Sequence, residues 1–223
     1  VNGQGKYVSY NRLFSTLTTT QIPGYGDFEV YPNRDSLQYC QLYGLEDIQT
    51  ILRGTLRRPG FCEAWNVFVQ LGCTDDSYIM ADSASLTYRQ YLESFLPADG
   101  NRGVEEELAD YFGLSQTSTV MDKISWLGLF SNEMIGLRDV TPAQILQHVL
   151  AEKWGMKQRD RDLLVMQHQF EYTVDNVTKR IISSMSYEGQ DRENTAMAYT
   201  VGLPLAIAVK LIATGQILPV GVN

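Results

Sequence analysis

The chain has few of the residues that build metal sites, disulfide frameworks or catalytic triads. It contains three cysteines and two histidines in 223 residues. The cysteines lie far apart, form no CxxC pair and are odd in number, which argues against both a disulfide framework and a zinc site. His148 and His168 fall in no recognised triad or ligand pair, so both are interpreted as structural residues.

Excess positive charge and long apolar runs are also missing. The net charge is -8 and the pI is about 4.8, so nucleic acid and anionic membranes are not expected as partners, because both require a basic surface. We find no run near the roughly 18 apolar residues of a membrane span. The N-terminal residues 1–11 lack the basic and apolar parts of a secretory signal, which predicts a soluble, cytoplasmic protein.

The fingerprint of a dinucleotide-binding unit is missing as well. That unit needs a strand, then GxGxxG, then a helix, with an acidic residue about 20 positions on. The string GQGKYV at residues 3–8 lacks the third glycine and has no strand before it. This chain alone is therefore not expected to bind NAD or NADP in the usual way.

Strand and helix signals alternate in the first third of the chain. The first two dozen residues show no clear period, whereas residues 24–31 predict a short strand and residues 35–43 a helix closed by Gly44. Residues 61–72 carry an apolar stripe at helical spacing that ends at Gly72.

A longer strand with a basic face is predicted between these elements. Residues 48–57 alternate, so that Leu52, Gly54 and Leu56 share one face and Arg53, Thr55 and Arg57 the other. The arginines should therefore point away from the core.

The middle of the chain, residues 73–160, predicts several short amphipathic helices. Thr141, Pro142 and Gln144 form the clearest start signal, a capping box with proline at the first helical position. The acidic run at residues 105–107 is interpreted as a solvated helix face.

The period returns to two after Arg161. The string VDNV at residues 174–177 predicts a hairpin with a two-residue turn, which would place Phe170 opposite Ile181 and His168 opposite Ser183.

The last long element, residues 195–214, has helical spacing interrupted by Gly202 and Pro204. We expect a kinked or broken helix there, ended by Gly215.

These patterns together predict an α+β fold. A mixed β-sheet domain with helices on it would use residues 1–72 and 161–223, and residues 73–160 would form an inserted all-helical subdomain.

Two strings, YPNRDS at 31–36 and RGTLR at 53–57, resemble the glutamate-forming saccharopine dehydrogenases. Further matching strings follow in the same order: WLGLFS at 126–131, RDLLVMQH at 161–168 and AMAYTVGLPLAIAVKLIATGQI at 196–217. One departure is Arg58, where an aromatic residue is more usual in the family.

The resemblance implies a family architecture in which the beginning and the extreme end of the chain build a Rossmann domain. An α/β domain that binds substrate and supports dimerisation lies between them, with a helical insertion. The present chain resembles the middle part, so we expect a piece of a longer protein and a homodimer. NADP(H) or NAD(H) would be bound by a Rossmann domain outside this chain.

The resemblance also implies a substrate, saccharopine, that carries three carboxylates. Arginine forks pair with carboxylates in bidentate fashion, which makes the arginines of the two strings candidates for substrate binding. The alternative for each arginine is a surface or capping role. For Tyr31 the alternative is packing under the sheet. For Met197 and Thr200 it is ordinary helix packing, against the interpretation in which their helix N-terminus receives a carboxylate. The candidate set is Tyr31, Asn33, Arg34, Arg53, Thr55, Arg57, Met197 and Thr200.

The expected function is the substrate-binding part of an oxidoreductase that interconverts saccharopine with glutamate and 2-aminoadipate 6-semialdehyde in lysine metabolism. The fragment alone should be inactive, and its acid and base residues are not identified. Two alternatives stay open: a dehydrogenase of another carboxyalkylated amine, and a non-catalytic dimerisation or binding module.

Overall fold

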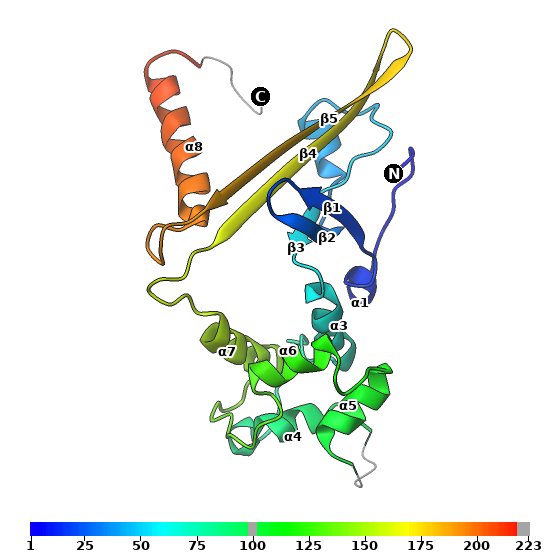
Figure 1. Cartoon of the computed structure of the whole chain (residues 1–223), viewed down its shortest axis with the longest axis vertical. Helices are drawn as coiled ribbons and strands as arrows, with labels where there is room; N and C mark the ends of the chain where they lie inside the picture. Colours follow the sequence, from blue (N-terminus) through cyan, green and yellow to red (C-terminus); the bar gives the residue numbers. More distant parts are fainter. Residues whose placement is uncertain (98–101, 218–223) are drawn as a thin grey trace.

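The structure is a computed structural model that describes residues 1–97 and 102–217. A small sheet and a long hairpin form one part of the molecule, and a group of helices forms the other (Figure 1). The elements, in chain order, are α1 Tyr10–Leu13, β1 Thr18–Ile22, β2 Gly26–Pro32, α2 Gln38–Leu42, β3 Gly54–Arg57, α3 Phe61–Leu71, the 3₁₀ turn η1 Ser83–Ser85, α4 Tyr88–Glu93, α5 Val104–Phe112, α6 Thr119–Leu127, α7 Pro142–Trp154, β4 Leu163–Val174, β5 Val177–Glu188 and α8 Ala196–Ala213.

Strands β1, β2 and β3 form an antiparallel sheet in that order. The strand predicted at 24–31 is β2, but β1 was missed because its sequence, TTTQI, has no apolar alternation. The strand predicted at 48–57 is wrong in its first six residues, and only Gly54–Arg57 is extended. Pro32 is the last β2 residue to pair, opposite Gly54, and the chain turns away at Arg34, so residues 48–52 have no neighbouring strand.

The predicted hairpin is confirmed. Asp175 and Asn176 have φ of 53° and 60°, the left-handed conformation that a type I′ turn requires at both central positions. The register pairs Phe170 with Ile181 and His168 with Ser183, as expected from the turn. Most side chains along both strands are exposed.

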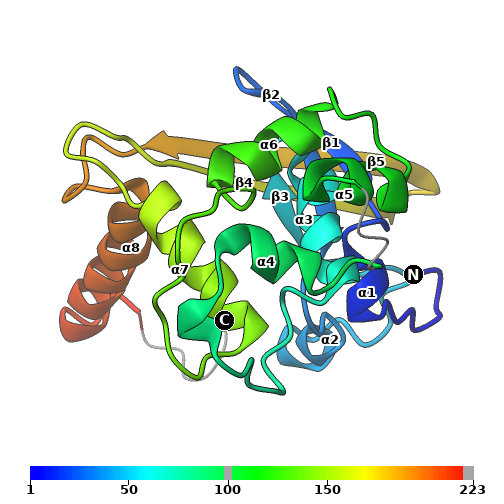
Figure 2. The same ribbon diagram turned by 90° about the horizontal axis from the view of Figure 1, so that it is seen from below.

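The helices of the middle segment share one core with α3. Side chains buried there come from α3, α4, α5, α6 and α7, including Phe68, Tyr91, Leu108, Ile124 and Ile145. α3 thus belongs by packing to the helical part, although it precedes the boundary predicted at residue 73, and the division into three segments stays a prediction. Figure 2 shows these helices from below.

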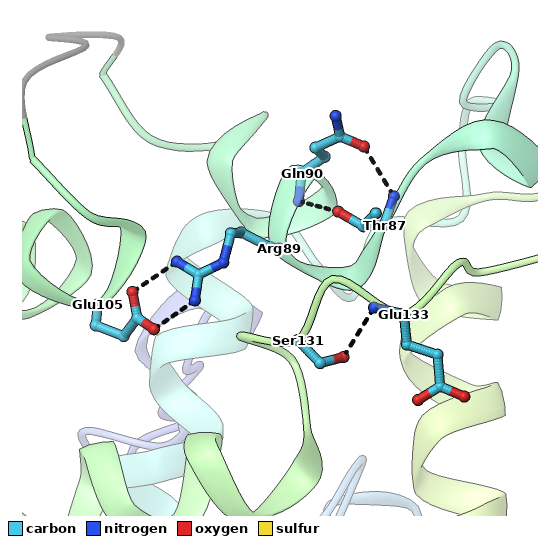
Figure 3. Close-up of polar contacts among 6 residues, drawn as sticks. All are labelled: Thr87, Arg89, Gln90, Glu105, Ser131 and Glu133. Atoms are coloured by element: carbon cyan, nitrogen blue, oxygen red, sulfur yellow. Dashed lines mark hydrogen bonds and ion pairs between the residues drawn. The ribbon is translucent and has the colours of Figure 1, made fainter.

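Capping boxes begin two of the core helices. Thr141 and Gln144 exchange side-chain and backbone hydrogen bonds with Pro142 at the first helical position, which confirms the start of α7. Thr87 and Gln90 do the same for α4, at 2.9 and 3.2 Å (Figure 3). Such a cap contributes about 1 kcal/mol, because it satisfies N–H groups that have no partner within the helix.

The acidic run on α5 is not the fully solvated face that the sequence suggested. Both carboxylate oxygens of Glu105 accept hydrogen bonds from the two terminal nitrogens of Arg89 on α4, at 2.6 and 2.7 Å (Figure 3). Glu106 is exposed as predicted. The Arg89 guanidinium lowers the pKa of Glu105 below its ordinary range.

Helix α8 starts where the base of the hairpin meets the loop after β5. The Asp162 carboxylate accepts the N–H groups of Ala196 and Met197 at 2.6 and 3.0 Å, and the Arg161 side chain donates to the carbonyl of Gly189 at 2.7 Å. Gly189 is buried in this junction. A carboxylate at a helix N-terminus is favourable because the N–H dipoles point at it.

Helix α8 runs unbroken through Pro204, so the expected break is absent. A proline removes one backbone hydrogen bond and leaves those of the adjacent turns. Contrary to the sequence interpretation, α8 is long and apolar enough to span a membrane: 18 residues with mean hydropathy 1.8 and 6% of the segment buried. Length and composition alone equally describe a helix that packs against protein.

We predict that Gly189→Ala lowers the free energy of unfolding by about 1–3 kcal/mol, since overpacking strains a filled site. A Cβ at this position would lie 2.2 Å from Oδ1 of Asp162 and 2.7 Å from the backbone nitrogen of Ala196. Urea unfolding measures the change. The control is Gly202→Ala within α8, where a Cβ meets nothing within 4 Å and stability should rise by about 0.5–1 kcal/mol. Equal effects of the two substitutions on the free energy of unfolding would contradict the close packing around Gly189.

We predict that Glu105→Gln destabilises the protein near neutral pH, whereas Glu106→Gln does not. The Glu105 side chain is 42% exposed, so solvent screening limits the pair to about 1 kcal/mol. A carboxyl whose pKa is depressed on folding stabilises the fold above its unfolded pKa, about 4.3, and loses this contribution as the pH falls through the folded value. The melting temperatures of the two variants should therefore converge in acid. If Glu105→Gln still melts at a lower temperature than Glu106→Gln there, the stabilisation by Glu105 is not ionic.

Candidate functional site

The pairing of β2 with β3 brings most of the predicted site residues onto one face. Tyr31 lies opposite Thr55, and Glu29 lies opposite Arg57. Alternate residues of a strand share a face, so these four side chains lie together. The N–H of Asn33 donates to the carbonyl of Arg53 at 2.8 Å and extends the pairing by one step.

The loop after β2, which carries Arg34, contacts Arg53. The hydroxyl of Ser36 accepts the Arg53 N–H at 3.1 Å, and the Arg53 guanidinium carbon lies 4.2 Å from the centre of the Tyr39 ring. Arg34 is exposed at the turn with φ of 46°, a conformation uncommon for residues other than glycine. The strings 31–36 and 53–57, recognised separately in the sequence, are thus in direct contact.

Arg57 lies over an aromatic ring and not against a carboxylate. Its guanidinium carbon is 5.2 Å from the centre of the Phe61 ring, and one terminal nitrogen donates to the carbonyl of Leu56 at 3.2 Å. Phe61 in turn stacks on Trp65, with ring centroids 5.8 Å apart. Arg57 is exposed, so its remaining N–H groups face solvent.

Glu29 lies opposite Arg57 and was not singled out in the sequence. Its two carboxylate oxygens accept the N–H groups of Gly60 and Cys62 at 2.7 and 3.1 Å, which caps α3. Burial, together with the Glu29 carboxylate, raises the pKa of the Cys62 thiol to about 12, so this cysteine stays protonated. One signal was present: residues 59–60 offer no side-chain cap, so α3 needs a carboxylate from elsewhere.

Tyr31 packs within a small aromatic cluster. Its ring centre lies 4.8 Å from that of Phe14, which is 7% exposed and also contacts Trp65. These contacts are those of the packing alternative considered for Tyr31, and they anchor β2 to α1 and α3.

Met197 and Thr200 lie away from Arg34, Arg53 and Arg57, the three arginines that we call the basic face. Both lie at the start of α8, which Figures 1 and 2 show apart from β3. The Met197 N–H is bound by Asp162, and the Thr200 hydroxyl donates to the carbonyl of Ala196 at 2.8 Å. The N-terminus of α8 therefore already receives a carboxylate of the protein.

The arginines of the basic face have no carboxylate partner in the described part of the chain. Ion pairs within residues 1–97 and 102–217 are formed by Arg89, Arg102 and Arg161. Arg34, Arg53 and Arg57 are not among them, in a chain whose net charge is -8. Arginine side chains without acidic partners are available to pair with the carboxylates of a ligand.

The described residues do not form a cradle for a dinucleotide. All strand pairs in residues 1–97 and 102–217 are antiparallel, whereas the dinucleotide-binding unit uses parallel strands joined by a helix. Over the same residues, no group of three His, Cys, Asp or Glu side chains could hold a metal ion. His168 stacks on Phe170, with ring centroids 6.0 Å apart, on the hairpin.

Comparisons with known proteins agree with the motifs. Over residues 1–223 the chain matches the family described as "Saccharopine dehydrogenase C-terminal domain". It is 30% identical over 223 residues to the Saccharomyces cerevisiae saccharopine dehydrogenase [NADP(+), L-glutamate-forming], covering 97% of this chain and 50% of that protein. It is 31% identical over 211 residues to the mitochondrial alpha-aminoadipic semialdehyde synthase of Rattus norvegicus, covering 92% of this chain and 22% of that protein.

A solved structure has the same fold. The apo histidine-tagged saccharopine dehydrogenase (L-Glu forming) from Saccharomyces cerevisiae matches with a TM-score of 0.83 and 30% identity, over 99% of this chain and 51% of that chain. This match confirms the predicted α+β class. The chain spans about half the length of that enzyme, and it belongs to the saccharopine dehydrogenase C-terminal domain family.

Proposed function

We propose that this chain is the substrate-binding portion of an NAD(P)-dependent oxidoreductase that interconverts saccharopine with glutamate and 2-aminoadipate 6-semialdehyde. The observation that carries the proposal is the set of three arginines at β3 and the loop that contacts it. The loop that carries Arg34 is hydrogen-bonded to the backbone of Arg53, and Arg57 ends β3. None of the three has a carboxylate partner in residues 1–97 and 102–217. Membership in the family supports the choice of substrate.

The chemistry of saccharopine fits a surface of this kind. Its three carboxylates call for several guanidinium forks, since each fork offers two parallel N–H donors to one carboxylate. Asn33 and Thr55 would add neutral hydrogen bonds, and Tyr31 would form the packed wall beneath them. The role of this portion is to hold the substrate so that its reacting C–N centre is correctly oriented, which is catalysis by positioning.

NADP(H) or NAD(H) would supply the redox chemistry from a Rossmann domain elsewhere in the parent protein, so the chain alone would be inactive. We also propose a cytoplasmic homodimer, and Met197 and Thr200, at the start of α8, remain candidates for substrate binding. A polycationic amine substrate is disfavoured, because it would require an acidic pocket where this face is basic.

Steady-state kinetics of the parent enzyme test the site. We expect Arg34→Ala and Arg53→Ala each to reduce kcat/KM for saccharopine by roughly ten- to a hundredfold, because each removes a charge-assisted hydrogen bond to a carboxylate. Lysine at either position keeps the charge but loses the fork, and should recover only part of the loss.

The matched control is Arg58→Ala. Arg58 is also exposed, but its guanidinium donates to the carbonyl of Tyr25 and lies 4.5 Å from the Phe28 ring centre. Its loss should leave kcat/KM near that of the unmodified enzyme. If the alanine variants at 34 and 53 keep near-normal efficiency, or lose activity only in step with lost thermal stability, these arginines are structural and the site is wrong.

A further inference from the structure

The ring of Tyr39 contacts the Arg53 guanidinium. The ring centre lies 4.2 Å from the guanidinium carbon, within the range of a cation–π interaction. Tyr39 belongs to the short helix α2, and its ring stacks on Tyr43 with centroids 5.6 Å apart and planes 26° apart. Tyr43 is 56% exposed, so the stack runs from the arginine to the protein surface.

The backbone of Arg53 is fixed separately from its side chain. Its carbonyl accepts the Asn33 N–H, and its own N–H donates to the Ser36 hydroxyl. Neither bond restrains the long side chain, which loses up to about 2 kcal/mol of rotamer entropy when it is held in one position. No hydrogen bond or ion pair of the guanidinium is formed within residues 1–97 and 102–217. The Tyr39 ring is in position to hold the guanidinium in place.

We infer that Tyr39 is a positioning residue, which seats the Arg53 guanidinium so that it can bind a carboxylate of the substrate. A guanidinium that contacts a ring through its face keeps its in-plane N–H donors for a carboxylate fork. A side chain held in place before binding loses less entropy when the ligand arrives. This inference rests on the proposed function, and it assigns a role to a residue outside the two recognised strings.

A double-mutant cycle in the parent enzyme tests the inference, with saccharopine as the varied substrate. Tyr39→Leu should raise KM by roughly two- to thirtyfold, which is the cation–π range expressed as an affinity ratio, and should change kcat less. Tyr39→Phe keeps the ring and should behave as the unmodified enzyme. Tyr111→Leu is the control for losing an exposed tyrosine, 54% accessible on α5, and should leave KM unchanged.

The decisive comparison is made in the Arg53→Ala background. If Tyr39 acts through Arg53, adding Tyr39→Leu there should cause no further rise in KM. Equal effects in both backgrounds, or a Tyr39→Phe variant as impaired as Tyr39→Leu, would overturn the positioning role while leaving the proposed function intact. A parent enzyme that does not oxidise saccharopine with NAD or NADP would instead overturn the proposed function, and the inference would fall with it.

Discussion

The pairing of β2 with β3 is the constraint on which the rest of the site depends. It ends in the hydrogen bond from the Asn33 N–H to the Arg53 carbonyl, after which the chain turns at Arg34. This register places Tyr31 opposite Thr55 and aligns Arg53 with the loop that carries Arg34. A shift by one residue would send these side chains to the opposite face of the sheet, because strand side chains alternate. Gly54 is required in this register, since a Cβ there would lie 2.3 Å from Cγ1 of Val30.

The same sheet is joined to the helical core through α3. Glu29 on β2 caps the helix, while Phe14, Tyr31 and Trp65 pack between the sheet and α3. The Glu29 carboxylate, opposite Arg57, is therefore engaged by backbone N–H groups. This arrangement leaves the guanidinium of Arg57 over Phe61 with its charge available.

The features predicted correctly are those that a few neighbouring residues determine, such as a tight turn or a helix cap. The VDNV turn fixed the whole register of the hairpin, and Thr141 with Gln144 marked the start of α7. Strand β1 was not predictable from alternation, because its sequence, TTTQI, contains one apolar residue and therefore shows no alternation of apolar and polar residues. The predicted strand at 48–57 was too long because strand length depends on the partner, which the sequence pattern does not contain.

In the candidate site, too, the sequence indicated local features but not the contacts between distant segments. Alternation placed Thr55 and Arg57 on one strand, whereas Arg53 precedes that strand. Alternation could not show that Ser36 and Tyr39 contact Arg53 across a loop. Met197 and Thr200 were grouped with the arginines through the family resemblance, and the structure places them at the start of α8. Contacts between segments distant in sequence require the fold.

A crystal structure of the parent enzyme with bound saccharopine would test the central claim most directly. The account predicts a substrate carboxylate within about 2.7–3.2 Å of the Arg53 guanidinium, with the Tyr39 ring still beneath it, and a second carboxylate near Arg34 or Arg57. An Arg53 guanidinium paired instead with a carboxylate from the other half of the protein, with saccharopine bound elsewhere, would contradict it.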